Sequence, residues 1–113
     1  MKYSLFIGRW QPWHEGHRWL IDQRLNEGLN VCIAIRDVDK SDSNPFSPTE
    51  IKRNLERELH DLITLKKVKV IIIPDIESIN YGRGVGYDII EHFPPEKVKK
   101  ISATDIRKKI FKK

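Results

Sequence analysis

Two histidines three residues apart, His14 and His17, stand where an apolar run gives way to a helical pattern. The run at residues 3–8 is typical of a buried strand. Where a helix follows such a strand, the first backbone N–H groups and the helix dipole attract anions. Two imidazoles add hydrogen-bond donors, Gly16 lets a ligand approach the backbone closely, and Arg9 adds charge. The pattern indicates an anion-binding site.

Two other interpretations of these histidines are open at this point. A histidine pair can bind zinc, but the remaining candidates for a third ligand, Cys32, His60 and His92, have no convincing spacing. His17 also falls on the apolar stripe of its helix, as a buried core histidine would. The turn that precedes the pair favours the anion site over both.

A second anion site is indicated near the other end of the chain. Ser102 is a good N-cap, so Ala103 and Thr104 would expose backbone N–H groups at a helix start. Arg107 flanks the apolar face of that helix and offers a planar fork that suits phosphate. The lysines at 108, 109 and 112 fall on the opposite, solvated side.

These segments resemble a known family. Residues 8–17, GRWQPWHEGH, are similar to the HxGH signature of the nucleotidyltransferase superfamily, with flanks closest to archaeal-type nicotinamide-mononucleotide adenylyltransferases. Residues 101–107, ISATDIR, resemble the I-S-x-T-x-I-R motif of the same superfamily. Residues 44–47 and 74–77 also resemble stretches of the adenylyltransferase group. The resemblance touches the whole chain, with gaps.

The resemblance implies transfer of a nucleoside monophosphate, AMP rather than CMP being favoured, from an NTP to a small phosphorylated acceptor. Pyrophosphate would be released, and Mg²⁺ would be held mainly by the NTP phosphates because the sequence has no carboxylate cluster for it. The catalytic residues implied are His14, His17 and Arg107. The implied nucleotide-binding residues are Gly8, Arg9, Trp10, Gly16, Ser102, Ala103 and Thr104.

The elements that must position these residues alternate along the chain. Strands are predicted at residues 3–8, 31–35 and 68–73, with a weaker one at 98–101. A helix lies between the first two strands, and another begins at the capping box of Ser47 and Glu50. This order predicts one α/β domain over residues 1–113, with a small parallel sheet and helices on both faces. The resemblance implies a Rossmann-like nucleotidyltransferase fold.

The acceptor side departs from the family, which usually has a further strand before the last motif. Here a short, glycine-spaced stretch carries Tyr81 and Arg83, which are predicted to bind the acceptor. A compact anionic acceptor is expected, with nicotinamide mononucleotide a poor substrate. The alternative is a nucleotide-binding module of the same fold with little or no catalysis.

Composition and charge bear on whether the protein binds nucleic acid, crosses a membrane or is secreted. The chain has 113 residues, of which 39% are hydrophobic and 33% charged, and its formal net charge is +5. Residues 96–113 hold eight basic and two acidic side chains, so the other 95 residues carry a net charge of −1. This local excess argues against a nucleic-acid groove. No apolar run suits a membrane span or signal peptide, and the lone Cys32 fits a reduced, cytoplasmic protein. Homo-oligomerisation is left open.

We expect Arg107→Lys to impair NTP use, because a lysine ammonium cannot reproduce the bidentate guanidinium fork. The matched control is the pair Lys108→Ala and Lys109→Ala, which should be nearly silent. Steady-state kinetics with the NTP as the varied substrate checks both. Equal losses would mean that this segment acts through general charge.

Overall fold

The computed structural model of this protein describes residues 1–84 and 86–100. The predicted nucleotide-site residues Ser102, Ala103, Thr104 and Arg107 therefore lie outside the described residues, as does the helix predicted to begin near Ser102. The first anion site, the acceptor stretch apart from residue 85, and all three main predicted strands lie within them.

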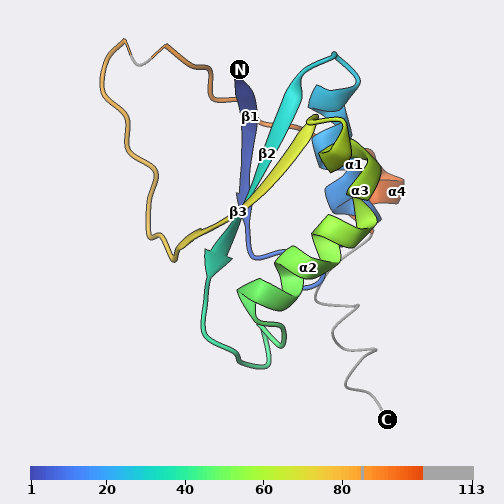
Figure 1. Cartoon of the computed structure of the whole chain (residues 1–113). Coiled ribbons are helices and arrows are strands. Elements are labelled where there is room, and N and C mark those ends of the chain that lie inside the picture. Colours follow the sequence, from blue (N-terminus) through green and yellow to red (C-terminus); the bar gives the residue numbers. More distant parts are fainter. Residues whose placement is uncertain (85, 101–113) are drawn as a thin grey trace.

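Three parallel strands form a single sheet in the order of the sequence (Figure 1). They are β1 (Tyr3–Gly8), β2 (Asn30–Asp37) and β3 (Val68–Pro74). The central strand β2 pairs with both neighbours, so that Ile33 lies opposite Phe6 on one side and Val70 on the other. The predicted α/β class, with a small parallel Rossmann-like sheet, is confirmed.

The helices gather on one side of this sheet. They are α1 (Glu15–Leu25), α2 (Pro48–Glu58), α3 (His60–Thr64) and α4 (Glu96–Lys99). Parallel crossovers are almost always right-handed, and both crossovers here step one strand in the same direction. Consecutive crossover helices therefore cover the same face, as Figure 1 shows. In the described part of the chain, this arrangement differs from the expected helices on both faces.

Helix α2 begins where its sequence predicts. The Ser47 hydroxyl accepts a bond from the Glu50 backbone N–H at 3.1 Å, and the Glu50 carboxylate accepts one from the Ser47 N–H at 3.4 Å. Ile51 and Leu55 are buried on its apolar stripe. The stripe continues to Leu59, where the backbone leaves helical geometry and separates α2 from α3.

The strand predicted at residues 98–101 is wrong for its described part, because residues 96–99 form the short helix α4. Pro95 stands at the N-cap of this helix, and Val98 is the only apolar residue within it. A single apolar side chain among lysines and a glutamate gives a strand too little to bury. The helix contacts α1 instead.

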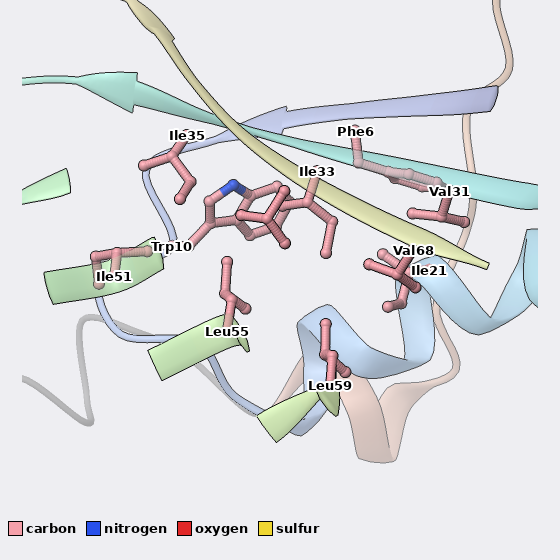
Figure 2. Packing of buried hydrophobic residues seen from close by; sticks show 11 residues of the cluster. Phe6, Trp10, Ile21, Val31, Ile33, Ile35, Ile51, Leu55, Leu59 and Val68 are labelled. Carbon is pink, nitrogen blue, oxygen red and sulfur yellow. The ribbon is translucent and has the colours of Figure 1, made fainter. Parts of the chain in front are cut away.

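Trp10 joins the first loop to the core. Its side chain is 5% exposed and lies between the sheet and α2 (Figure 2). The indole Nε1–H donates to the backbone oxygen of Ala34 in β2 at 3.1 Å. A Cβ on Gly8 would come within 2.9 Å of the Trp10 ring. Gly8 therefore leaves the space that the indole fills.

The stretch from β3 to α4 is irregular and largely exposed. Residues 75–95 contain no helix or strand among those described, and Figure 1 shows the first part of this stretch on the side of the sheet away from the helices, before the chain crosses to α4. Large apolar side chains are exposed there, including Ile79, Tyr87, Ile89 and Phe93. Among the described helices, none is long and apolar enough to cross a membrane.

Gly8→Ala should destabilise the protein by about 1–3 kcal/mol, because the added methyl group overlaps an indole that is fixed by packing and by a hydrogen bond. Gly82→Ala is the matched control, since no atom lies within 4 Å of the methyl group it would add. Urea unfolding of the two variants measures the difference. Equal stabilities would contradict the close packing of Gly8 against Trp10.

Candidate active site

His14 and His17 cap the helix that they begin. The N–H of Gly16 donates to Nδ1 of His14 at 3.0 Å, and the N–H of His14 donates to Nδ1 of His17 at 3.2 Å. The two side chains thus form a reciprocal capping box, a role more often filled by Ser or Thr with Glu or Gln. The i, i+3 spacing that suggested chemistry also fits this local structure.

The cap determines which nitrogen of each ring carries the proton. Because Nδ1 accepts a backbone N–H in both His14 and His17, the neutral ring has its hydrogen on Nε2. Each imidazole therefore connects a backbone N–H of the helix start to an Nε2–H donor. The rings are stacked, with centroids 3.7 Å apart and planes inclined by 18°. The pair presents two adjacent donors at the positive end of α1.

Burial keeps both histidines uncharged near neutral pH. It lowers the pKa of His14, and it acts with the neighbouring His14 to lower the pKa of His17 to about 3. A proton on Nδ1 would also break the cap, because that nitrogen could no longer accept the backbone N–H. At neutral pH the histidines can therefore donate hydrogen bonds to a ligand but carry no charge, and any positive charge at the site comes from arginine side chains.

Aromatic side chains build the wall behind His17. The Trp10 ring meets the His17 ring edge-on at 4.8 Å, and the Trp13 ring lies 5.4 Å from it. Trp10, which was predicted to bind nucleotide, has its side chain in the core and packs edge-on against His17, and its nucleotide-binding role stays a prediction. Gly8 likewise lies beneath the Trp10 ring. Of the predicted nucleotide residues, Gly16 has its N–H in the cap and Arg9 is exposed.

The first loop is tied to the loop between β2 and α2. An Arg9 guanidinium nitrogen donates to the Asn44 side-chain oxygen at 3.2 Å. Two residues further along both loops, the buried Gln11 amide donates to the Phe46 backbone oxygen at 2.8 Å and accepts from its N–H at 3.0 Å. Sequence reasoning assigned no role to Gln11. The signal that could have indicated a structural role is its position between Trp10 and Pro12, where a polar side chain follows a large apolar one.

Two hollows lie among the described residues, one beside the first loop and one beside the segment after β3. One of about 320 Å³ opens beside His14 and is also lined by Trp13, Arg18 and Asn54. The other, of about 390 Å³, lies under the start of the segment that follows β3. Its lining residues are Ile7, Arg36, Ile76, Glu77, Ser78 and Ile79. Arg36 is held there by Asp75, with 2.8 Å between its guanidinium and the carboxylate.

The predicted acceptor residues lie apart from the histidines. Tyr81 is 63% exposed and Arg83 is exposed as well. Their segment leaves the carboxyl end of β3 and runs back along the sheet, away from the start of α1 (Figure 1). The structure therefore brings together His14 and His17, with Arg9 in the loop that precedes them, but does not bring Tyr81 and Arg83 to the same place.

Cys32 is unsuited to nucleophilic catalysis. It is buried in the central strand, and burial raises the pKa of its thiol even though Lys69 acts in the opposite direction. A thiol that stays protonated is a poor nucleophile. Within the described residues, no three His, Cys, Asp or Glu side chains gather as a metal site would require.

The fold is a small parallel α/β sheet with an anion-binding helix start after its first strand, and comparison with known proteins shows which proteins the chain is similar to. Proteins named nicotinamide-nucleotide adenylyltransferase are similar to this chain. The one from Methanococcus aeolicus is 40% identical over 80 residues, which are 66% of this chain and 43% of the relative. The one from Ignicoccus hospitalis is 34% identical over 76 residues, 65% of this chain and 44% of the relative. The one from Pyrococcus furiosus is 33% identical over 84 residues, 73% of this chain and 44% of the relative.

The resemblance to archaeal nicotinamide-mononucleotide adenylyltransferases is thereby confirmed over about two thirds of this chain. The matched part spans less than half the length of each of these relatives. No family model matches the chain. No solved structure matches it either.

The histidine pair predicts how stability depends on pH. Below the ordinary histidine pKa of 6.5 the unfolded chain binds protons at His14 and His17, whereas the folded chain, with lowered pKa values, resists them. Stability therefore rises with pH in this window and is lost as the pH falls. Between pH 7 and pH 5 we expect the melting temperature to fall by about 4 °C or more, equivalent to about 1 kcal/mol.

Differential scanning calorimetry of His17→Asn tests this assignment, because the variant should lose much of the pH dependence. The exposed His60 provides the matched control, and His60→Asn should keep the full dependence. The same slope in all three proteins would show that His17 is not held neutral by the fold. The window ends at pH 5 because carboxyl groups titrate below it.

Proposed function

We propose that this protein transfers AMP from ATP to a small phosphorylated acceptor and releases pyrophosphate. The observation that carries the proposal is the reciprocal cap of His14 and His17, which directs two Nε2–H donors from the start of α1. The similarity to proteins named nicotinamide-nucleotide adenylyltransferase supports it.

In such a transfer an oxygen of the acceptor phosphate attacks the α-phosphorus of ATP. The bond from that phosphorus to the bridging oxygen breaks, and its electron pair leaves with pyrophosphate. A protein accelerates this step mainly by positioning the phosphates and by stabilising the charge that moves onto them. In our proposal the Nε2–H groups of His14 and His17 donate to phosphate oxygens, and Arg9 supplies positive charge. Arg107 is proposed to add a second cation.

We further propose that ATP enters as its Mg²⁺ complex. Mg²⁺ prefers oxygen ligands and usually keeps substrate phosphates among them. Since the described residues hold no carboxylate cluster, the triphosphate oxygens and water would supply most of the ligands of the ion. The residues proposed here then act on phosphate oxygens and not on the ion.

The acceptor is the less constrained half of the proposal. The names of the relatives make nicotinamide nucleotide the first acceptor to test. The expectation that it is a poor substrate rested on the short segment after β3, and it stays a prediction. The hollow beside Arg36 opens at the carboxyl edge of the sheet and is the proposed acceptor pocket. It combines apolar walls with Arg36, which is paired with Asp75, and with Glu77 and Ser78. The roles of Tyr81 and Arg83 also stay predictions.

A nucleotide-binding module with little catalysis is the second candidate. The observation that favours it is the exposure of the segment expected to form the acceptor pocket, where Tyr81 is 63% exposed. Such a protein would bind ATP through the same histidine cap and release no pyrophosphate. A cytoplasmic location and the absence of nucleic-acid binding remain predictions, and the oligomeric state is left open.

The variant His14→Asn separates the proposed catalytic role of His14 from its role as the N-cap of α1. Asparagine is among the best N-cap residues and can accept the helix N–H, but it lacks the Nε2–H donor. We expect pyrophosphate release by His14→Asn to fall about 100-fold, as for loss of one transition-state donor, with an unchanged melting temperature. His14→Ala should lose both activity and stability.

A coupled assay of pyrophosphate release, with ATP and a panel of phosphorylated acceptors including nicotinamide mononucleotide, measures these rates. Wild-type protein that binds ATP but releases no pyrophosphate with any acceptor would favour the binding module. Near-wild-type turnover of His14→Asn would remove His14 from the chemistry.

A further inference from the structure

Gln11 is the one buried polar side chain among the described residues, at 2% exposed. Its amide makes a two-way contact with a single residue from another loop, 35 positions away in the chain. The Nε2 group donates to the Phe46 backbone oxygen at 2.8 Å, and Oε1 accepts from the Phe46 N–H at 3.0 Å. The side chain thus satisfies the backbone of a loop that has no strand partner.

This contact is one of two between the same pair of loops. Arg9 reaches Asn44, and Gln11 reaches Phe46, so both contacts advance by two residues along each loop. The residue between them, Trp10, points the other way and is anchored in the core. The loops leave the carboxyl ends of the neighbouring strands β1 and β2.

The Arg9–Asn44 and Gln11–Phe46 contacts differ in their exposure to solvent. The Arg9 contact is exposed, and a guanidinium in that position is free to exchange Asn44 for an anionic ligand. Asn44 itself is fixed from behind, because its amide nitrogen donates to the Ser41 hydroxyl at 3.3 Å. The Gln11 contact is part-buried, with the Gln11 side chain itself 2% exposed, so it is less open to exchange with solvent than the Arg9 contact and holds the two loops together.

We propose that Gln11 is a positioning residue for the nucleotide. It holds residues 44–47 against the first loop, so that Arg9 and the donors of His14 and His17 face one bound triphosphate. This inference rests on the proposed function. Gln11 does not touch the substrate, and it acts through the placement of Arg9.

The chemistry of the contact explains why an amide is needed. Phe46 presents one donor and one acceptor, and only a side chain with both can pair with them at once. Gln11→Glu keeps the size but sets a carboxylate oxygen against the Phe46 carbonyl. Gln11→Met keeps the volume and removes the two hydrogen bonds to Phe46.

The test compares ATP binding by calorimetry in wild-type protein, Gln11→Met, Gln11→Glu and Ile21→Val. Ile21 is fully buried against the sheet and lies in neither loop, so Ile21→Val controls for a general loss of stability. We expect both Gln11 variants to bind ATP at least about tenfold more weakly, because misplaced binding groups lose effective alignment. Ile21→Val should bind as the wild type does.

A double-mutant cycle with Arg9→Ala decides whether Gln11 works through Arg9. If it does, Gln11→Met should cost much less affinity in the Arg9→Ala background than in the wild type. A merely structural role would give additive losses. Amide hydrogen exchange at Phe46 provides a readout without nucleotide, and it should accelerate in Gln11→Met but not in Arg9→Ala.

Three results would overturn the inference. Two of them are wild-type affinity in Gln11→Met and strict additivity with Arg9→Ala, and both would leave the proposed function standing. Wild-type protein without affinity for ATP would overturn the proposed function itself, and the role of Gln11 with it.

Discussion

The site depends on the way the chain turns after β1, with Trp10 directed into the core. Its indole lies between the sheet and α2, donates to Ala34 and fills the space above Gly8. An indole buried to this extent contributes a large apolar area and fixes the backbone on either side of it. The flanking Arg9 and Gln11 then face the loop from β2, and the chain reaches α1 with His17 against the Trp10 ring. Packing in the core therefore sets the geometry of the polar groups.

The histidine pair caps the start of α1 and, through the same hydrogen bonds, leaves two Nε2–H donors available for a ligand. Two backbone N–H groups at the start of α1 need acceptors, and the Nδ1 atoms of His14 and His17 provide them. Once those bonds form, the Nε2–H groups are the remaining donors and the rings stay neutral. Hydrogen bonds in a chain polarise one another, so the helix start strengthens the donors at the far side of each ring. A site of this kind attracts anions without burying a positive charge, which would be costly.

The two halves of the candidate site differ in how firmly the protein builds them. The nucleotide side rests on packed elements, with the buried Trp10 and Gln11 beneath it and the capped helices α1 and α2 on either side. The acceptor side borders a segment of exposed side chains, and its best-formed feature is the Arg36–Asp75 pair under the end of β3. The proposed nucleotide site is therefore built from packed, capped elements, whereas the proposed acceptor site is more open to solvent.

The sequence by itself determined the three strands, the start of α2 and the place of the first site, but not the short helix α4. Apolar runs located the three strands, and the Ser47 and Glu50 pattern located the start of α2, because these signals act between near neighbours in the chain. The pair His14 and His17 was found for the same reason, since i, i+3 spacing alone brings the rings together on one turn. Only the tertiary structure decided that Trp10 is a core residue, that Gln11 holds Phe46, and that the described helices share one face of the sheet. Those outcomes depend on contacts between residues 24 to 35 positions apart and on the order of the strands, which no local pattern encodes.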